Sequence, residues 1–427
     1  MSAPSTWTRT RVDRVATVSA RIGWKALTAN EYEPEGYVFL ATPNIKSTSI
    51  DFDNVNYISQ FRFEESPELK LEPKDVLLVK DGNTLGITNI VCELPRPATV
   101  NGSIAVLRAF GIESRFLRYS LASTPTQELI DAIKGGMGVP HLFQWDIRRL
   151  PLDLPPFDEQ CRIADFLDAE SARIDHLSKL LDYQLRLLDM RRRNHLAKEA
   201  EALGKRYGQV RVRHVLRKIE QGWSPPCEDR LAVRDEWGVV KAGCVNGGVF
   251  NPGQHKALPV GIQPDLRYRL RPGDLLMSRA SGSTELIGSI AVLPDNLSWQ
   301  LLLCDKVYRL YLDRTRMIPN FVAFILRSQQ AREQIRLGIS GAEGMANNLP
   351  TATVTNLLVP NVPLIEQGHI VADLENSSHT TSETIRLLKK QLVLLAERRQ
   401  ALITAAVTGQ IDVTTARGVI PAGGVSA

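Results

Sequence analysis

A repeat between the two halves of the chain constrains its fold more than any local motif does. The segment LLDYQLRLLDMRR at 180–192 returns as LLKKQLVLLAERR at 387–399, with eight of thirteen residues identical at a shift of 207 positions. Over 159–200 and 366–407 the copies align without a gap and share thirteen identities in 42 positions. Internal repetition of this kind indicates a duplicated structural unit. We therefore expect two copies of one design in this chain.

Each copy has the pattern of a long helix after a lead that carries proline, LPLDLPPFDEQ at 150–160 and LVPNVPLIEQ at 358–367. Proline before an acidic residue is typical of a helix start, because proline lacks only an amide hydrogen that the first turn leaves unpaired. Apolar residues then recur at spacings of three and four, the period of a coiled-coil seam. Helices of about forty residues span roughly 60 Å, so we expect each to pack along the other. The seam positions are Ile163, Leu167, Ile174, Leu177, Leu181 and Leu188 in the first copy and Ile370, Leu374, Leu388 and Leu395 in the second.

The segments between the helices repeat more faintly. LEPKDVLLVKDGNTLG at 71–86 resembles LRPGDLLMSRASGSTELIG at 270–288, and GYVFLATPN at 36–44 lies over GVVKAGCVN at 238–246. Their short apolar runs, punctuated by Gly, Pro, Asn and Asp, predict strands. Short amphipathic helices are expected late in each half, at 116–133 and 319–336. The fold class expected is α+β, with two tandem mixed α/β domains joined by two long helices.

Length and composition fit this organisation. A chain of 427 residues exceeds the size at which a single hydrophobic core keeps growing, and 43% hydrophobic with 23% charged residues is typical of a soluble protein. We expect a cytoplasmic location, because the sequence has no run of eighteen apolar residues and no apolar segment after its basic first residues. The predicted order is a mixed domain at 1–150, a helix at 151–204, a second mixed domain at 205–357, a helix at 358–413 and a disordered tail at 414–427.

Motifs for catalysis and metal binding are absent from the sequence. It contains no GxxxxGK[ST], no GxGxxG after a strand, no HExxH, and no NPPF or DPPY of the kind that amino-methyltransferases use. The five cysteines and seven histidines lack the spacing of metal ligands. We therefore expect no catalytic site, no metal and no cofactor bound by this chain.

A duplicated unit on a helical frame suits a binding protein. Two copies related by a pseudo-twofold axis can engage a ligand that has two halves, and duplex DNA presents half-sites about one turn, roughly 34 Å, apart. A net charge of +5 is compatible with DNA binding without deciding it. A scaffold that holds two copies of a protein partner and an enzyme of unrecognised type remain as alternatives.

Five sets of residues carry a family resemblance. They are RIGWKALTANEY at 21–32, IEQGWSPP at 219–226, the blocks around Asp75 and Asp274, the leads PPFDEQ and VPLIEQ, and RRQALITAAVTGQIDV at 398–413. Together they resemble the specificity subunits of type I restriction-modification systems over nearly the whole chain. One departure is the polar stretch NSSHTTSE at 376–383 in the second helix.

The resemblance implies a non-catalytic subunit that reads a bipartite, asymmetric target in double-stranded DNA. Its two target-recognition domains are joined by helices that form an antiparallel coiled coil, to which two modification subunits dock. In this family the modification subunits use S-adenosylmethionine to methylate adenine at N6, taking the base out of the duplex. Restriction subunits with ATP-driven translocase activity also join the complex, so ATP and magnesium belong to the partners.

Candidates for DNA contact follow from the chemistry of base readout, in which Arg or Lys binds guanine and Asn or Gln binds adenine. Phosphate contacts and bystanders outnumber base-reading side chains, so solvated surface is the competing interpretation for each. Because Lys80 and Arg279 are alike in both domains, they suit a shared role such as backbone positioning. The candidates are Arg21, Lys25, Asn44, Lys46, Lys80 and Asn83 in the first domain and Gln221, Lys241, Asn246, Lys256, Arg279 and Ser281 in the second.

Overall fold

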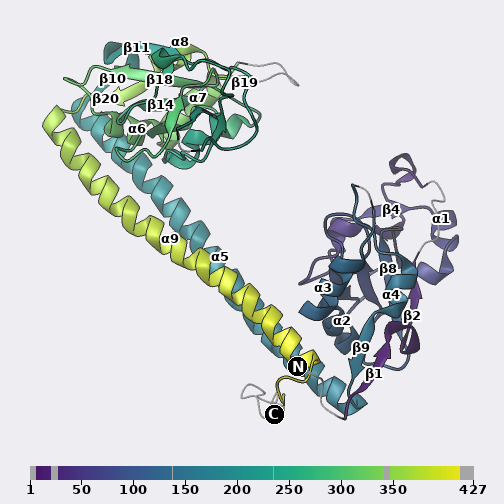
Figure 1. The fold of residues 1–427 in the computed structure, drawn as a ribbon. Coiled ribbons are helices and arrows are strands. Elements are labelled where there is room, and N and C mark those ends of the chain that lie inside the picture. The colour runs from purple at the N-terminus through teal and green to yellow at the C-terminus, as the bar shows by residue number, and fades with distance from the viewer. Residues whose placement is uncertain (1–5, 21–26, 137, 234, 341–346, 414–427) are drawn as a thin grey trace, which may run out of the picture. The chain divides into compact units, whose positions relative to one another are not determined.

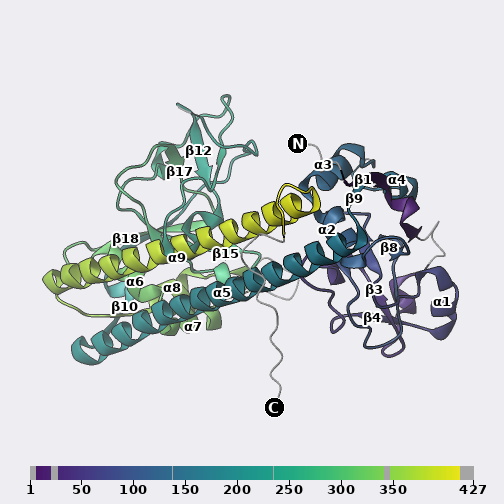
Figure 2. The same cartoon turned by 90° about the horizontal axis from the view of Figure 1, so that it is seen from below.

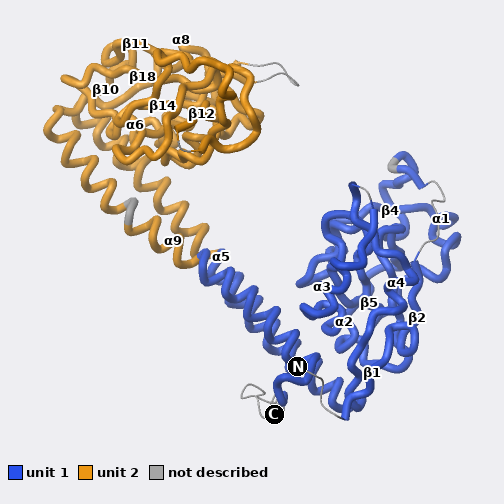
Figure 3. The backbone as a smooth tube through the Cα atoms, viewed as in Figure 1, with its two compact units in different colours: residues 1–182, 389–427 blue, residues 183–388 orange. Residues whose placement is uncertain are grey.

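The protein forms two compact units that each combine parts from both halves of the sequence. The computed structural model describes residues 6–20, 27–136, 138–233, 235–340 and 347–413, so the predicted tail at 414–427 lies outside the described residues. Unit 1 comprises residues 1–182 and 389–427, and unit 2 comprises 183–388 (Figure 3). Across the described ranges, no helix combines the length and the hydropathy needed to cross a membrane.

Two long helices run through both units. They are α5 (Phe157–Tyr207), of 51 residues, and α9 (Leu364–Val407), of 44 residues, and both are uninterrupted (Figures 1 and 2). Both helices are longer than the forty residues that the repeat alone predicts.

Unit 1 holds a four-stranded sheet of order β2-β8-β5-β6, a three-stranded sheet of order β4-β3-β7 and a two-stranded pair β1-β9. The strands are β1 (Thr8–Arg11), β2 (Ala16–Ser19), β3 (Tyr37–Leu40), β4 (Asn56–Ile58), β5 (Val76–Val79), β6 (Thr88–Ile90), β7 (Ala98–Val100), β8 (Ile104–Ala109) and β9 (Pro151–Leu154). The short helices are α1 (Gln60–Glu64), α2 (Ser114–Ala122), α3 (Thr124–Ile133) and α4 (Gln144–Arg149).

Unit 2 repeats this topology, with sheets of order β11-β18-β14-β16 and β13-β12-β17 and the pairs β10-β20 and β15-β19. The strands are β10 (Gln209–Arg211), β11 (Leu216–Gln221), β12 (Trp237–Val240), β13 (His255–Ala257), β14 (Leu275–Ser278), β15 (Ala280–Ser281), β16 (Ile290–Val292), β17 (Gln300–Leu302), β18 (Val307–Leu312), β19 (Asn347–Asn348) and β20 (Leu358–Pro360). The short helices are α6 (Pro319–Leu326), α7 (Gln329–Leu337) and α8 (Thr351–Asn356).

The repeat extends to strand direction. In both units the central strand of the three-stranded sheet pairs antiparallel on one side and parallel on the other, as β3 does with β4 and β7 and β12 does with β13 and β17. The expected pseudo-repeated α+β architecture with two long helices is therefore confirmed.

The four-stranded sheet of each unit is buried on both faces, which explains its continuous apolar strands. Val76 and Leu78 of β5 belong to the core shared with α2 and the long helices, whereas Leu77 and Val79 belong to the core shared with the three-stranded sheet. Because successive side chains of a strand face opposite sides, an uninterrupted VLLV run fills two layers. In β14, Leu275 and Leu276 divide between two cores in the same way.

The ends of the long helices are buried in the domains. In unit 1, Ile163 and Leu167 from the start of α5 share a core with Ile403 and Ala406 from the end of α9. Arg399 of α9 also forms an ion pair with Asp175 of α5. The beginning of one helix thus lies beside the end of the other, which is the antiparallel arrangement.

Unit 2 combines the other two helix ends, the end of α5 and the start of α9. Ala200 and Leu203 from the end of α5 share its core with Val371 from the start of α9, and Arg206 lies 3.5 Å from Glu366. Within the polar stretch 376–383, the hydroxyls of Thr380 and Thr381 donate to the carbonyls four residues earlier, at 3.1 and 2.9 Å.

Burial along the predicted seam depends on the distance from a domain. Ile163, Leu167 and Ile174 are buried, whereas Leu177 is 42% exposed. The remaining seam positions, Leu181, Leu188, Ile370, Leu374, Leu388 and Leu395, are partly buried.

One buried glutamine in each repeat fixes a long helix to its domain. Gln160 Nε2 donates to the Pro155 carbonyl at 2.8 Å, and its Oε1 accepts the Glu113 amide at 2.9 Å. Gln367 does the same in unit 2, donating to the Val362 carbonyl at 2.8 Å and accepting the Ile318 amide at 2.9 Å. The duplicated Glu-Gln pair of the sequence thus marks the junction between each domain and its helix.

We expect Gln160→Leu and Gln367→Leu each to lower the free energy of unfolding by about 1–3 kcal/mol, because each leaves a buried amide without its acceptor. Urea unfolding of the full chain measures this change. The same substitution at the exposed Gln184 of α5 is the control. Equal stability of all three variants would show that the junction bonds contribute nothing.

Candidate nucleic-acid interface

A basic groove in unit 2 brings together two of the sequence-predicted residues. Lys241 and Lys256 line a groove of about 500 Å³ with Lys306, beside the ends of β12 and β13. Among the described residues, Asp305 is the only acidic one in its lining. Asp229 lies 3.0 Å from Lys256 and 3.8 Å from Lys241, and these lysines, Lys256 foremost, lower the pKa of its carboxyl group. The groove is therefore positive and open to an anionic ligand.

The chemistry of this groove is that of binding rather than of covalent catalysis. Cys304 and Cys227 also line it. Burial raises the pKa of Cys304 to about 11 and raises that of Cys227, so both thiols stay protonated at neutral pH and are poor nucleophiles.

The other candidates of the second domain lie outside the lining of this groove. Arg279 donates from Nη1 to the Asp305 carbonyl at 3.4 Å. Gln221 is exposed at the end of β11 and precedes Trp223, whose amide donates to the Leu303 carbonyl at 3.0 Å. Ser281 lies in β15, where its Oγ accepts the Ser283 amide at 3.3 Å. Asn246 lies in the 3-10 segment η6 (Ala242–Gly248) and has a buried Oδ1 without a partner among the described residues.

The first-domain candidates are more dispersed. Lys46 is exposed and pairs with Asp51 of its own loop at 3.1 Å. Lys80 is buried and pairs with Asp81 at 3.0 Å, and Asn83 is exposed in the turn that follows. Arg21 and Lys25 lie outside the described residues.

The structure corrects one match between the two halves. The sequence overlay places Asn44 on Asn246, but Asn44 occupies the position of Cys244, because its carbonyl accepts the Asp51 amide at 2.9 Å as that of Cys244 accepts the Asn251 amide at 2.7 Å. The side chain of Asn44 is 6% exposed. Its Oδ1 accepts the Ala41 amide at 2.9 Å, and its Nδ2 donates to the carbonyls of Asp51 and Asn54 at 3.3 and 2.8 Å, so its bonds lie within its own loop.

Lys80 and Arg279 have the same backbone environment, as their duplication suggests. The Lys80 amide donates to the Ser103 carbonyl at 2.8 Å, and the Arg279 amide donates to the Lys306 carbonyl at 2.8 Å. The Lys80 carbonyl accepts the Leu142 amide, just as the Arg279 carbonyl accepts that of Leu349, both at 2.8 Å.

Sequence reasoning missed two features. Lys306 also lines the basic groove. No sequence motif surrounds it, so its role became visible only from its position in the structure, directly before β18. In unit 1 the segment HLFQW presents an exposed aromatic surface, with Phe143 and Trp145 48% and 55% exposed and their rings 6.3 Å apart. His141 of this segment forms a hydrogen bond with Asp81, next to Lys80. The alternation of aromatic residues was the signal that could have identified it.

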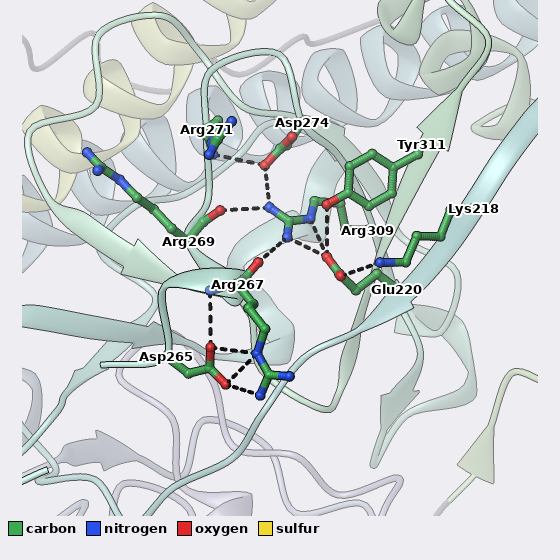
Figure 4. Close-up of polar contacts among 9 residues, drawn as sticks. All are labelled: Lys218, Glu220, Asp265, Arg267, Arg269, Arg271, Asp274, Arg309 and Tyr311. Carbon is green, nitrogen blue, oxygen red and sulfur yellow. Dashed lines mark hydrogen bonds and ion pairs between the residues drawn. The ribbon is translucent and has the colours of Figure 1, made fainter. Parts of the chain in front are cut away.

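The aspartate that both domains share holds a loop in each of them. Asp75 accepts two parallel bonds from Arg108 at 2.8 and 2.9 Å and one from the Glu72 amide at 2.8 Å. Asp274 accepts from Arg309 at 3.0 Å and from the Arg271 amide at 2.9 Å (Figure 4).

Arg309 is the centre of a buried polar network in unit 2. Its Nε donates to Glu220 at 2.9 Å, Nη1 to the Arg269 carbonyl at 2.7 Å and Nη2 to the Arg267 carbonyl at 3.0 Å (Figure 4). Burial opposes ionisation of Glu220, but hydrogen bonds from Lys218, Arg309 and Tyr311 lower its pKa below the usual 4.5. The network fixes β11 and β18 beside the basic groove.

Two tandem domains of one topology share a helical frame, and the second domain carries a basic groove, which suits a duplicated recognition subunit. The chain is similar to the specificity subunits of type I restriction-modification systems. A model of the type I restriction modification DNA specificity domain matches residues 4–182. These subunits are non-catalytic components of their complexes.

Known relatives match almost the full length. The chain is 21% identical over 425 residues to the type I restriction enzyme StySPI specificity subunit of Salmonella potsdam, and 21% identical over 427 residues to the EcoKI specificity subunit of Escherichia coli strain K12. Each comparison covers 96% of this chain and 90% of the relative. A chain in a solved structure of the type I R-M system has the same fold, with a TM-score of 0.69 at 19% identity, covering 96% of this chain and 100% of that chain.

Because the folded-state pKa of Glu220 lies below 4.5, its contribution to stability is complete above that pH and is lost as pH falls through the folded-state pKa. We expect Glu220→Gln to lower the free energy of unfolding at pH 7 by about 3 kcal/mol, since Arg309 loses a buried partner. The deficit should shrink in acid. Urea unfolding at pH 7 and pH 3.5 measures both effects, with the exposed Glu128→Gln of α3 as the control. A deficit that is independent of pH would contradict the proposed origin.

Proposed function

We propose that this chain is the sequence-specific double-stranded DNA-binding subunit of a type I restriction-modification complex and that it reads a bipartite, asymmetric target. The observation that supports this most strongly is that the two domains share one backbone frame but present different side chains on it. Lys241 and Lys306 of the second domain correspond to Ala41 and Ser103 of the first, because equivalent strands and loops hold them. Different side chains on one frame allow each domain to read its own half-site.

Target-recognition domains at 1–150 and 205–357, with spacer helices at 151–204 and 358–413, complete the proposal. The lysines of the basic groove neutralise DNA phosphates, which contributes affinity without sequence information. Lys46 and Asn83 are exposed on loops and Gln221 is exposed at the end of β11, so these side chains can reach base edges. Arg279, like Lys80, suits backbone positioning.

Apolar residues exposed on the long helices support the docking of partner subunits. In unit 1 these are Leu177 and Leu180 of α5 with Val393 and Leu394 of α9, and in unit 2 they are Tyr183, Leu187 and Met190 of α5 with Leu387 of α9. Each is 42–58% exposed, and clustered apolar surface of this kind marks protein interfaces. One set in each unit suits two modification subunits, which carry S-adenosylmethionine. Restriction subunits with ATP and magnesium join that assembly.

Co-expression with the modification subunit tests the central proposal. N6-methyladenine mapped across host DNA by single-molecule sequencing should reveal a split, asymmetric motif with a fixed gap. Exchange of residues 1–150 for another first domain should change one half of the motif and leave the other half intact. Methylation that is unchanged when this chain is omitted would reject the proposal and favour the scaffold that never contacts DNA.

The basic groove makes a separate prediction. Lys241→Gln with Lys256→Gln should weaken duplex binding and reduce the slope of log K against log salt by about 2, since each phosphate contact contributes roughly 1. Sequence preference should persist. The matched control replaces the exposed helix residues Lys205 and Lys389, which removes the same charge outside the groove. An equal loss of slope in the control would show that the groove has no special role.

A further inference from the structure

A second groove of unit 2 is rich in arginine and is distinct from the basic groove above. It has a volume of about 660 Å³ and lies between the end of α5, the short helices α6 and α7, and the glycines Gly248 and Gly288. Five arginines line it against two glutamates. Its size is within the range of about 300–1,000 Å³ that is usual for ligand sites. The arginines are Arg192, Arg193, Arg327, Arg332 and Arg336.

Two of these arginines are partly buried, and among the described residues their guanidinium groups form hydrogen bonds only with backbone carbonyls. Arg327 Nη1 donates to the Gly248 carbonyl at 3.2 Å. Arg332 donates to the carbonyls of Ile287 at 2.6 Å and Glu285 at 2.8 Å. Burial lowers the pKa of both groups, and repulsion from Arg192 lowers that of Arg327 further. A buried cation without an anion costs free energy, so the groove contains charge that the fold itself does not balance.

Nearby acids do not remove this imbalance. Arg192 and Arg193 share a single carboxylate, Asp189, at 3.2 and 2.7 Å. Glu333 accepts a bond from the neutral Gln329 at 3.1 Å and keeps its charge, so with Glu285 and Asp189 the described acids offset only part of the charge of the five arginines. Glu285 raises the pKa of Arg332 only as a secondary effect that burial outweighs.

Unit 1 provides an internal comparison, because an equivalent groove of about 530 Å³ lies beside α2, α3 and the end of α9. The equivalence follows from the alignment of FLRYSLAS with FVAFILRS and of the short helices after them. Arg327, Arg332 and Arg336 are replaced there by Ala122, Gln127 and Asp131.

The groove of unit 1 shows that the fold does not require these charges. Gln127, which replaces Arg332, donates to the carbonyls of Gly86 at 2.9 Å and Leu121 at 2.7 Å. Arg399, the counterpart of Arg192, forms an ion pair with Asp175. A neutral side chain therefore supplies the backbone hydrogen bonds, and the extra positive charge of unit 2 needs another explanation.

We propose that the arginine groove of unit 2 is a binding site for phosphate groups. Guanidinium groups bind phosphate oxygens through paired, charge-assisted hydrogen bonds, and several arginines around one open groove suit a ligand with more than one phosphate. A DNA backbone and a free polyphosphate both have this chemistry. The site does not depend on the proposed function, because a polyphosphate would occupy it even if the chain read no DNA sequence.

Pyrophosphate binding to the full chain tests the proposal by calorimetry and by thermal unfolding at constant ionic strength. The test variant combines Arg327→Ala with Arg332→Gln and so copies the residues that unit 1 folds with. We expect it to bind pyrophosphate about 10-fold or more weakly, because it loses charge-assisted bonds. Without pyrophosphate it should be at least as stable as the native chain, since unbalanced buried charge is removed. A purely structural role for the arginines predicts lower stability instead.

Two further variants provide a second test of the groove and a control outside it. Arg336→Asp alters an exposed residue of the groove and should also weaken pyrophosphate binding. Arg213→Ala with Arg271→Gln removes the same charge from exposed positions outside the groove and should bind as the native chain does.

Competition with duplex DNA identifies the natural source of the phosphate. Displacement of pyrophosphate by the duplex would assign the groove to the DNA backbone, whereas simultaneous binding would assign it to a free polyphosphate. Native protein that gains no stability from pyrophosphate beyond that from chloride would overturn the proposal, as would equal affinity in the test variant and the control. Methylation mapping reports on target recognition separately, so failure of the two proposals can be distinguished.

Discussion

The burial of each long-helix end inside a domain core is the constraint on which the rest of the structure depends. A helix of 51 or 44 residues has far more surface than a partner helix can cover, and helices in proteins gain most of their stability from the packing of an apolar face. Ile163 and Leu167 of α5 are buried in unit 1, and Ala200 and Leu203 of the same helix are buried in unit 2. One helix is thus part of two cores, and Gln160 and Gln367 hold the two starting points in place.

The two units share one backbone frame but differ in their surface side chains. The sheets, the buried aspartate and arginine pairs and the junction glutamines are alike in both units, because each fills a core or satisfies buried polar groups. The grooves at the domain surfaces differ. The second domain has lysines at two positions where the first has alanine and serine. Likewise, unit 2 has Arg327 and Arg332 at the positions that Ala122 and Gln127 occupy in unit 1. Surface side chains can change without loss of the core, which allows two copies of one fold to bind different things.

Much of the fold could be predicted from the sequence. Apolar periodicity and proline-bearing leads indicated α5 and α9, and short apolar runs indicated strands such as β5 and β14, since buried strands need apolar residues on both faces. The candidate site was less accessible. Lys241 and Lys256 were named from their residue type alone, whereas Lys306 comes from a distant strand. The match of Asn44 with Asn246 failed because loop insertions shift the register, and only hydrogen bonds identify Cys244 as the counterpart.

The sequence by itself determined the duplication, the two long helices and the order of the domains, because these depend on local periodicity and on similarity between segments of one chain. Only the tertiary structure decided that each unit combines the start of one helix with the end of the other, and that five arginines share a groove with fewer carboxylates among the described residues. The physical reason is that burial and charge balance depend on residues far apart in the chain. Their proximity is set by packing, which no local pattern encodes.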